Sequence, residues 1–232
     1  MLGKASAADI AKRRDALLGR LRAAAEAAGR DPDGFRIVAV TKTFPTVVCR
    51  AAFDAGLTAL AENRVQEALP KIAALPEAEW HLVGHLQSNK VRRAVASFAT
   101  IHSVDSVDLL RRIDAAAHDL VRRPRLLLQV NVSGEPMKSG FAPPTVLQPD
   151  TVDALAGTQN VDVVGLMTIG PQHADPRPGF AGLRRLRDGL QEKLGRPLPE
   201  LSMGMSADAE AGVAEGATLV RIGTALFGPR PG

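Results

Sequence analysis

Residues 37–45 read IVAVTKTFP, a short apolar run that ends directly in a polar segment carrying Lys42. Similar short apolar runs recur along the chain and alternate with longer amphipathic stretches, a pattern typical of βα units around a parallel sheet. Eight units of even length favour a closed (β/α)8 barrel of the TIM type over an open doubly wound sheet. We predict strands at residues 37–40, 58–61, 80–83, 100–103, 125–130, 161–166, 200–203 and 218–222.

The segment that precedes these units is predicted to form an additional helix. Residues 1–30 are rich in Ala, Leu and Arg, with Ile10, Leu17 and Leu21 on one stripe at helical spacing, and the turn residues that follow end the helix. We expect the barrel to occupy residues 35–228, so that residues 1–232 form a single α/β domain.

Composition argues against several classes of protein. The chain has 232 residues with a formal net charge of +4 and only 3% aromatic residues. The small positive charge and the few rings on which bases could stack argue against a nucleic-acid partner. Cys49 is the sole cysteine, so no intrachain disulfide or cysteine-built metal site is expected. No apolar run approaches the roughly 20 residues that cross a bilayer, and we expect a cytoplasmic protein with no membrane association.

Lys42 is the strongest single candidate for a reactive residue. Barrels of this kind carry their functional residues at the C-terminal ends of the strands, and Lys42 directly follows the apolar run at 37–40. A lysine desolvated in the barrel mouth is a nucleophile able to form a Schiff base. Alternatively, its stem packs on the rim and its ammonium reaches water.

The segments SMGMSAD at 202–208 and RIGT at 221–224 predict a phosphate site after strands seven and eight. Ser206 is placed to cap a helix over residues 209–215, and Gly223 and Thr224 add a backbone N–H and a hydroxyl. A plain helix cap and a plain turn are the alternative.

Three further polar features allow a structural or a functional interpretation. Arg221, inside the last strand, needs a partner, which is either Glu210 or Glu215 or a ligand acceptor atom. The pair of histidines at 81 and 85 spans a strand end without a carboxylate cluster, and we expect no metal site there. Lys138, in a loop-like segment, faces either a ligand or solvent.

Seven segments occur in the order and spacing of a known family. The segments are IVAVTKTFP (37–45), ENRVQEALPK (62–71), WHLVGHLQSNKVR (80–92), IHSVDS (101–106), QVNVSGEPMKSGF (129–141), GLMTIGP (165–171) and LSMGMSADAEAGVAEGATLVRIGTALFG (201–228). On these segments the chain resembles the pyridoxal phosphate homeostasis protein family, whose fold is similar to the N-terminal barrel of alanine racemase. One slight departure is Ala61, where we expect a glycine.

The resemblance implies that Lys42 carries pyridoxal 5'-phosphate (PLP) as a Schiff base. It also implies that Arg221 faces the pyridine nitrogen and that His102 is a further neighbour of the ring. The cofactor-binding residues that it implies are Lys42, Asn63, Met203, Ser206, Arg221, Gly223 and Thr224.

Two classes of function then follow: a non-catalytic PLP-binding protein of intracellular vitamin B6 homeostasis, or a PLP-dependent amino-acid racemase. We favour the first. An arginine at the ring nitrogen leaves that nitrogen largely unprotonated, which weakens the cofactor as an electron sink. The sequence has no tyrosine, the residue that alanine racemase uses as a base, and it ends soon after the eighth strand, so we expect an open barrel mouth and a monomer. Expected partners are PLP, small amino or keto acids and PLP-dependent apo-enzymes.

A third hypothesis is that the protein is a Schiff-base aldolase acting on a phosphosugar. It also uses a lysine beside a phosphate pocket, but it predicts a colourless protein.

Overall fold

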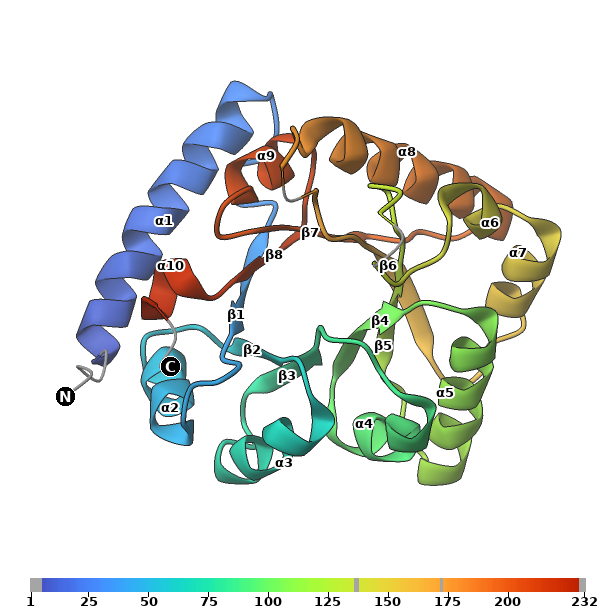
Figure 1. The fold of residues 1–232 in the computed structure, drawn as a ribbon, viewed down its shortest axis with the longest axis horizontal. Helices are drawn as coiled ribbons and strands as arrows, with labels where there is room; N and C mark the ends of the chain where they lie inside the picture. Colours follow the sequence, from blue (N-terminus) through green and yellow to red (C-terminus); the bar gives the residue numbers. More distant parts are fainter. Residues whose placement is uncertain (1–5, 136–137, 172, 230–232) are drawn as a thin grey trace.

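A closed barrel of parallel strands forms the centre of the molecule (Figure 1). The computed structural model describes residues 6–135, 138–171 and 173–229. Within these residues eight strands pair in chain order, and the first pairs with the last, which confirms the predicted barrel. They are β1 (Arg36–Val40), β2 (Ala59–Glu62), β3 (Glu79–Leu82), β4 (Thr100–Val104), β5 (Arg125–Gln129), β6 (Asp162–Met167), β7 (Glu200–Met205) and β8 (Leu219–Ile222).

The helices surround this barrel in a ring (Figure 1). Each predicted strand is present, with bounds that differ by at most two residues. The helices are α1 (Ala7–Ala27), α2 (Thr46–Asp54), α3 (Val65–Ala74), α4 (Val91–Ser97), α5 (Val107–Leu120), α6 (Pro143–Val146), α7 (Pro149–Ala156), α8 (Arg177–Leu194), α9 (Ala209–Ala214) and α10 (Thr224–Phe227), with a short 3-10 turn η1 (Ser88–Lys90) before α4. Among the described helices, none is long and apolar enough to cross a bilayer.

Helix α1 is the predicted N-terminal helix, although residues 1–5 of that segment lie outside the described residues. It begins at a capping box in which Ser6 Oγ accepts from the Asp9 N–H at 3.1 Å and the Asp9 carboxylate accepts from the Ser6 N–H at 3.2 Å. Its buried stripe includes Ile10 and Leu21. This stripe faces α2, α9 and α10, so α1 covers the barrel where the first and last strands meet (Figure 1).

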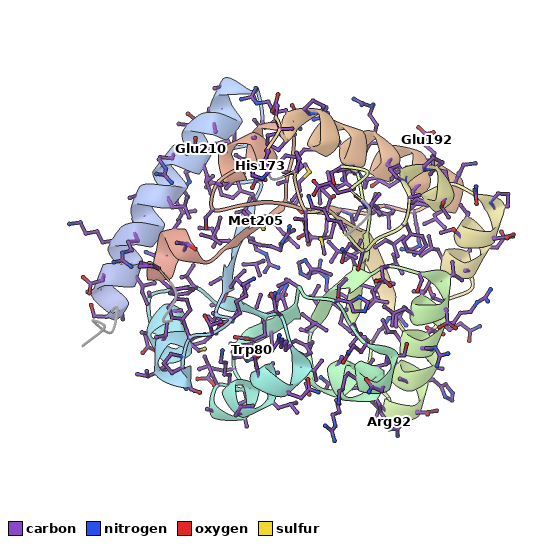
Figure 2. The ribbon with its side chains drawn as sticks, in the orientation of Figure 1. Trp80, Arg92, His173, Glu192, Met205 and Glu210 are labelled. Carbon is purple, nitrogen blue, oxygen red and sulfur yellow. The ribbon has the colours of Figure 1, made fainter. Side chains whose placement is uncertain are left out.

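Side-chain alternation separates the inside of the barrel from the layer beneath the helices. On β1, Val38 belongs to a small interior cluster, whereas Ala39 belongs to the larger core that packs against the helices. The side chains drawn in Figure 2 fill the ring of strands, and Met205 lies towards its centre while Arg92 and Glu192 lie on the periphery. The interior cluster consists of Val38, Ala59, Ala61, Leu127, Met167 and Leu219.

A layer of alternating charges lies at the N-terminal end of the barrel. The first residues of the four odd-numbered strands are Arg36, Glu79, Arg125 and Glu200. Their salt bridges measure 3.1 Å from Arg36 to Glu79, 3.9 Å from Glu79 to Arg125 and 2.6 Å from Arg125 to Glu200. In TIM barrels alternate strands contribute the four side chains of a layer, most often apolar ones. Here an ionic layer occupies the end opposite the C-terminal ends of the strands.

Candidate functional site

A cavity of about 290 Å³ lies at the C-terminal ends of the strands, where barrels of this type carry their sites. A wider groove of about 820 Å³ lies on the outer surface along α5 and α7, away from the strand ends. Six of the seven predicted cofactor-binding residues line the cavity, and Met203 is the exception. The lining residues are Val40, Lys42, Phe44, Asn63, Val83, Ile169, Met205, Ser206, Ala207, Arg221, Gly223 and Thr224.

Lys42 reaches the cavity because of the alternation along β1 and the turn that follows it. Val38 and Val40 face the interior, so Lys42, two residues further on, projects into the mouth. The Phe44 N–H donates to the Thr41 carbonyl at 3.1 Å, and Thr43 within this turn has φ of +69°. A non-glycine residue in the left-handed region carries local strain, a feature that clusters at functional sites. The turn therefore presents Lys42 at a defined position.

A buried ion pair holds this turn from the other side. Lys71 on α3 donates to the Glu62 carboxylate at 2.6 Å and to the Thr41 carbonyl at 2.9 Å, and Thr41 Oγ1 donates to the same Glu62 oxygen at 2.6 Å. Glu62 is the last residue of β2, and its side chain faces the helix layer rather than the barrel rim. Sequence reasoning did not single out Lys71, because nothing local identifies its partner.

Arg221 is a buried cation whose hydrogen bonds go to uncharged groups. It donates from Nη1 to the Ser202 carbonyl at 2.8 Å and to Ser202 Oγ at 2.6 Å, and from Nη2 to the Thr168 carbonyl at 2.7 Å. Burial lowers the pKa of Arg221 to about 10, an effect that the charge of Asp208 opposes. The guanidinium thus remains charged at neutral pH and keeps donors directed to the cavity.

The salt-bridge interpretation of Arg221 is wrong. Glu210 pairs with Arg20 at 3.3 Å, and Glu215 pairs with Arg184 at 3.1 Å. Both glutamates belong to the outer layer, whereas Arg221 faces inward from β8.

Ser206, Gly223 and Thr224 meet at one wall of the cavity. The prediction that Ser206 caps the helix is wrong, because Asp208 occupies the N-cap position of α9. Ser206 Oγ instead accepts from the Ala225 N–H at 3.4 Å. A Cβ at position 223 would lie 3.3 Å from the Val40 carbonyl oxygen, so glycine allows β8 to approach β1 here. This wall therefore carries two hydroxyl groups, from Ser206 after β7 and from Thr224 after β8.

The structure does not place Met203 at the cavity. Its side chain is fully buried in the core beneath the helices, because Ser202 faces inward and its neighbour on the strand faces outward. Met205 lines the cavity instead. Gly204, with φ of +90°, lies where the pairing of β7 with β8 changes register, and this irregularity turns Met205 to the mouth.

Of the two other predicted neighbours of the cofactor ring, one lies at the cavity and one does not. Asn63 lines the cavity, and Gly84 is required beside it because a Cβ there would clash with the Asn63 carbonyl oxygen. His102 is fully buried behind Arg221, with Nδ1 at 2.9 Å from Ser202 Oγ, and is not a lining residue.

The remaining polar candidates have protein partners. His81 contacts His102 at 2.8 Å, while His85 contacts Asp105 at 3.0 Å, so the two histidines at this spacing serve different partners. Lys138 donates to Glu135 at 2.7 Å and to the Gly170 carbonyl at 2.8 Å; residues 136–137 of its loop lie outside the described residues.

This chain is similar to proteins of one known family over most of its length. The family model described as the alanine racemase N-terminal domain matches residues 13–231. A relative from Aquifex aeolicus named pyridoxal phosphate homeostasis protein is 42% identical over 219 residues, covering 92% of this chain and 95% of the relative. A protein of the same name from Pseudomonas aeruginosa is 44% identical over 213 residues, covering 91% of each chain.

Solved structures show the same similarity. PipY of Synechococcus elongatus without PLP matches with a TM-score of 0.86 at 41% identity, covering 94% of this chain and 100% of that chain. PipY with PLP bound matches with a TM-score of 0.83 at 40% identity over the same shares. An alanine racemase from Clostridium difficile, 16% identical with a TM-score of 0.69 over 85% of this chain and 53% of its own, shares the fold. The chain therefore belongs to the pyridoxal phosphate homeostasis protein family, built on the alanine racemase N-terminal barrel.

Proposed function

We propose that this protein binds PLP in the cavity at the barrel mouth and serves in intracellular vitamin B6 homeostasis. The observation that carries the proposal is the convergence of a lysine amine, an arginine guanidinium and two hydroxyl groups on one cavity of about 290 Å³. That volume is close to the lower bound of about 300 Å³ for small-ligand pockets. The names of the relatives and the PLP-bound PipY structure support the same ligand.

The donor set of the cavity fits this cofactor. PLP supplies an aldehyde that a lysine amine can take up as a Schiff base, and Lys42 is the amine that lines the cavity. Ser206 and Thr224 would donate to the phosphate, with Gly223 leaving room for it. Arg221 would donate to the pyridine nitrogen, and as a donor without acceptor capacity it keeps that nitrogen unprotonated. Asn63 and Met205 would contact the ring.

We propose that binding proceeds without efficient turnover of an amino acid. Among the described lining residues, Lys42 and Arg221 are the basic side chains, and Arg221 keeps its charge at neutral pH, so Lys42 is the one candidate for a base. A racemase needs a base on each face of its substrate, and the sequence offers no tyrosine for the second. Lys42 and Asn63 are half-buried, so free amino or keto acids and apo-enzymes could reach the cofactor.

The test is a visible absorption spectrum of the protein loaded with PLP, before and after borohydride, followed by peptide mass spectrometry. We expect a yellow protein in which borohydride attaches the cofactor to Lys42. Lys42→Ala should lose the band, whereas Lys12→Ala, an exposed lysine on α1, should keep it. A protein that takes up no PLP would refute the proposal and favour the aldolase. Rapid conversion of one enantiomer of alanine into a racemic mixture would instead identify an enzyme.

A further inference from the structure

A chain of buried polar side chains runs through the barrel from the cavity to its opposite end. Arg221 Nη1 lies 2.6 Å from Ser202 Oγ, which lies 2.9 Å from His102 Nδ1. His102 Nε2 lies 2.8 Å from His81 Nδ1, and His81 Nε2 lies 3.0 Å from the Glu79 carboxylate. Ser202 and both imidazoles are fully buried, and Glu79 belongs to the ionic layer at the N-terminal end. None of these four lines the cavity, so the cofactor site does not use them directly.

The donors and acceptors allow one direction for this chain. Arg221 can only donate, so Ser202 Oγ accepts from it and has its own hydrogen left to give. Among the described residues, His102 Nδ1 is the remaining partner of that hydroxyl, and it must therefore accept. A neutral imidazole that accepts at Nδ1 donates at Nε2. Hence His102 carries its proton on Nε2.

The hydrogen bonds keep this direction from His102 to the Glu79 carboxylate. His81 Nδ1 accepts from His102 Nε2–H, so His81 also carries its proton on Nε2 and donates it to Glu79. Burial holds the pKa of His102 well below its usual range, which keeps this imidazole neutral. Every hydrogen bond then points from Arg221 towards Glu79.

We propose that His81 and His102 are positioning residues for Arg221, forming a one-directional relay from Arg221 through Ser202 to Glu79. Arg221 makes no hydrogen bond to a carboxylate in the described part of the chain, so the relay supplies its link to a negative charge. Polarised hydrogen bonds in series strengthen one another in a low-dielectric interior. The relay thereby directs the guanidinium to the cavity, and its role towards the ring nitrogen rests on the proposed function.

Among the described residues, the charged groups near the relay lie at its two ends. At the far end Glu79 also contacts Arg36 on β1 and Arg125 on β5, and Arg125 contacts Glu200 on β7. At the cavity end Arg221 feels the charge of Asp208. Between them the interior neighbours are apolar side chains such as Leu127 and Met167.

The first experiment measures the imidazole protonation states directly by nitrogen-15 NMR of the protein without cofactor. We expect His81 and His102 both to be neutral with the proton on Nε2 at pH 7. Assignments come from the loss of signals in single variants, since the sequence has five histidines. A proton on Nδ1 of His102, or a charged His102, would overturn the relay. This measurement does not depend on PLP.

The second experiment compares variants in PLP binding and in the pH profile of the bound cofactor's absorption. His102→Phe and Ser202→Ala break the relay and should weaken PLP binding about tenfold, the effect of one lost hydrogen bond to a charged group, and shift the profile. His102→Gln offers an acceptor and a donor in the same order and should restore both readouts. His118→Gln, at an exposed histidine on α5, is the matched control.

The outcomes separate the relay from the proposed function. A folded Ser202→Ala variant with wild-type PLP affinity and an unchanged pH profile would contradict the relay. A His102→Gln variant that binds PLP no more tightly than His102→Phe would contradict it as well. If the wild type takes up no PLP, the proposed function fails, and the tautomers seen by NMR still decide whether the relay exists.

Discussion

At the scale of single residues, two methionines on β7 show how one strand serves two environments. Met203 is fully buried beneath the helices, while Met205 is 38% exposed and lines the cavity. Strict alternation would direct both side chains the same way. Gly204 and the register change beside it remove that constraint, since the left-handed φ at position 204 is costly for any residue with a side chain.

These two methionines give opposite predictions. Met203→Ala should lower the free energy of unfolding by about 2–5 kcal/mol, the cost of a cavity in a packed core, and leave PLP affinity close to that of the wild type. Met205→Ala should weaken PLP binding with little effect on stability. Urea unfolding and a PLP titration of each variant measure both quantities. Equal loss of stability in the two variants would contradict the assignment.

At the scale of elements, the buried pair of Glu62 and Lys71 joins β2, α3 and the turn that carries Lys42. The side chains are 0% and 8% exposed, so removing one partner leaves a buried charge without its counterion. Glu62 Oε2 has no hydrogen-bond partner among the residues that the structure describes, which makes the carboxylate more dependent on Lys71. The position of Lys42 thus depends on a residue of a neighbouring helix through the Thr41 carbonyl.

Lys71→Met should lower the free energy of unfolding by about 3–5 kcal/mol because it leaves the Glu62 carboxylate buried and unpaired. The double variant Glu62→Leu/Lys71→Met should recover most of that loss, since both charges are then absent. A double-mutant cycle in urea tests the coupling. Additive losses in the two single variants and the double variant would show that the pair is not coupled.

At the scale of the whole molecule, the barrel has a different chemical character at each end. An ionic layer of four charged side chains closes the N-terminal end, and the cavity opens at the C-terminal end. A hydrogen bond from His81 lowers the pKa of Glu79 to about 2 from the ordinary 4.5, with Arg36 contributing in the same direction and burial opposing. The ionised carboxylate is therefore part of the folded state.

The sign of the pH dependence follows from this shift. A carboxyl group with a depressed folded-state pKa stabilises the protein fully above its unfolded pKa, and that stability is lost as pH falls from about 4.5 towards 2. We expect Tm to fall across this range and Glu79→Gln to make the fall shallower. Thermal unfolding at several pH values, with Glu192→Gln on the exposed surface of α8 as control, measures it. A profile that Glu79→Gln leaves unchanged would contradict the assignment.

Much of this architecture could be predicted from local pattern. Most strands contain a short apolar run with turn residues near its end, and such runs are visible without knowledge of their partners. Lys42 could be assigned to the barrel mouth because alternation from a buried strand determines the side to which it points. The loops after strands seven and eight were likewise identified by position, which brought Ser206, Gly223 and Thr224 to the cavity wall.

The barrel, its closure and the face that carries the site could therefore be predicted from the chain alone, because these depend on the order and periodicity of apolar runs. The contacts between polar groups, by contrast, depend on how distant segments pack together. His102 and Ser202 are 100 positions apart, and Arg221 bonds to Ser202 rather than to a glutamate near it in the chain. Such contacts depend on strand register and on one irregularity at Gly204, and both result from packing across the closed sheet rather than from local preference.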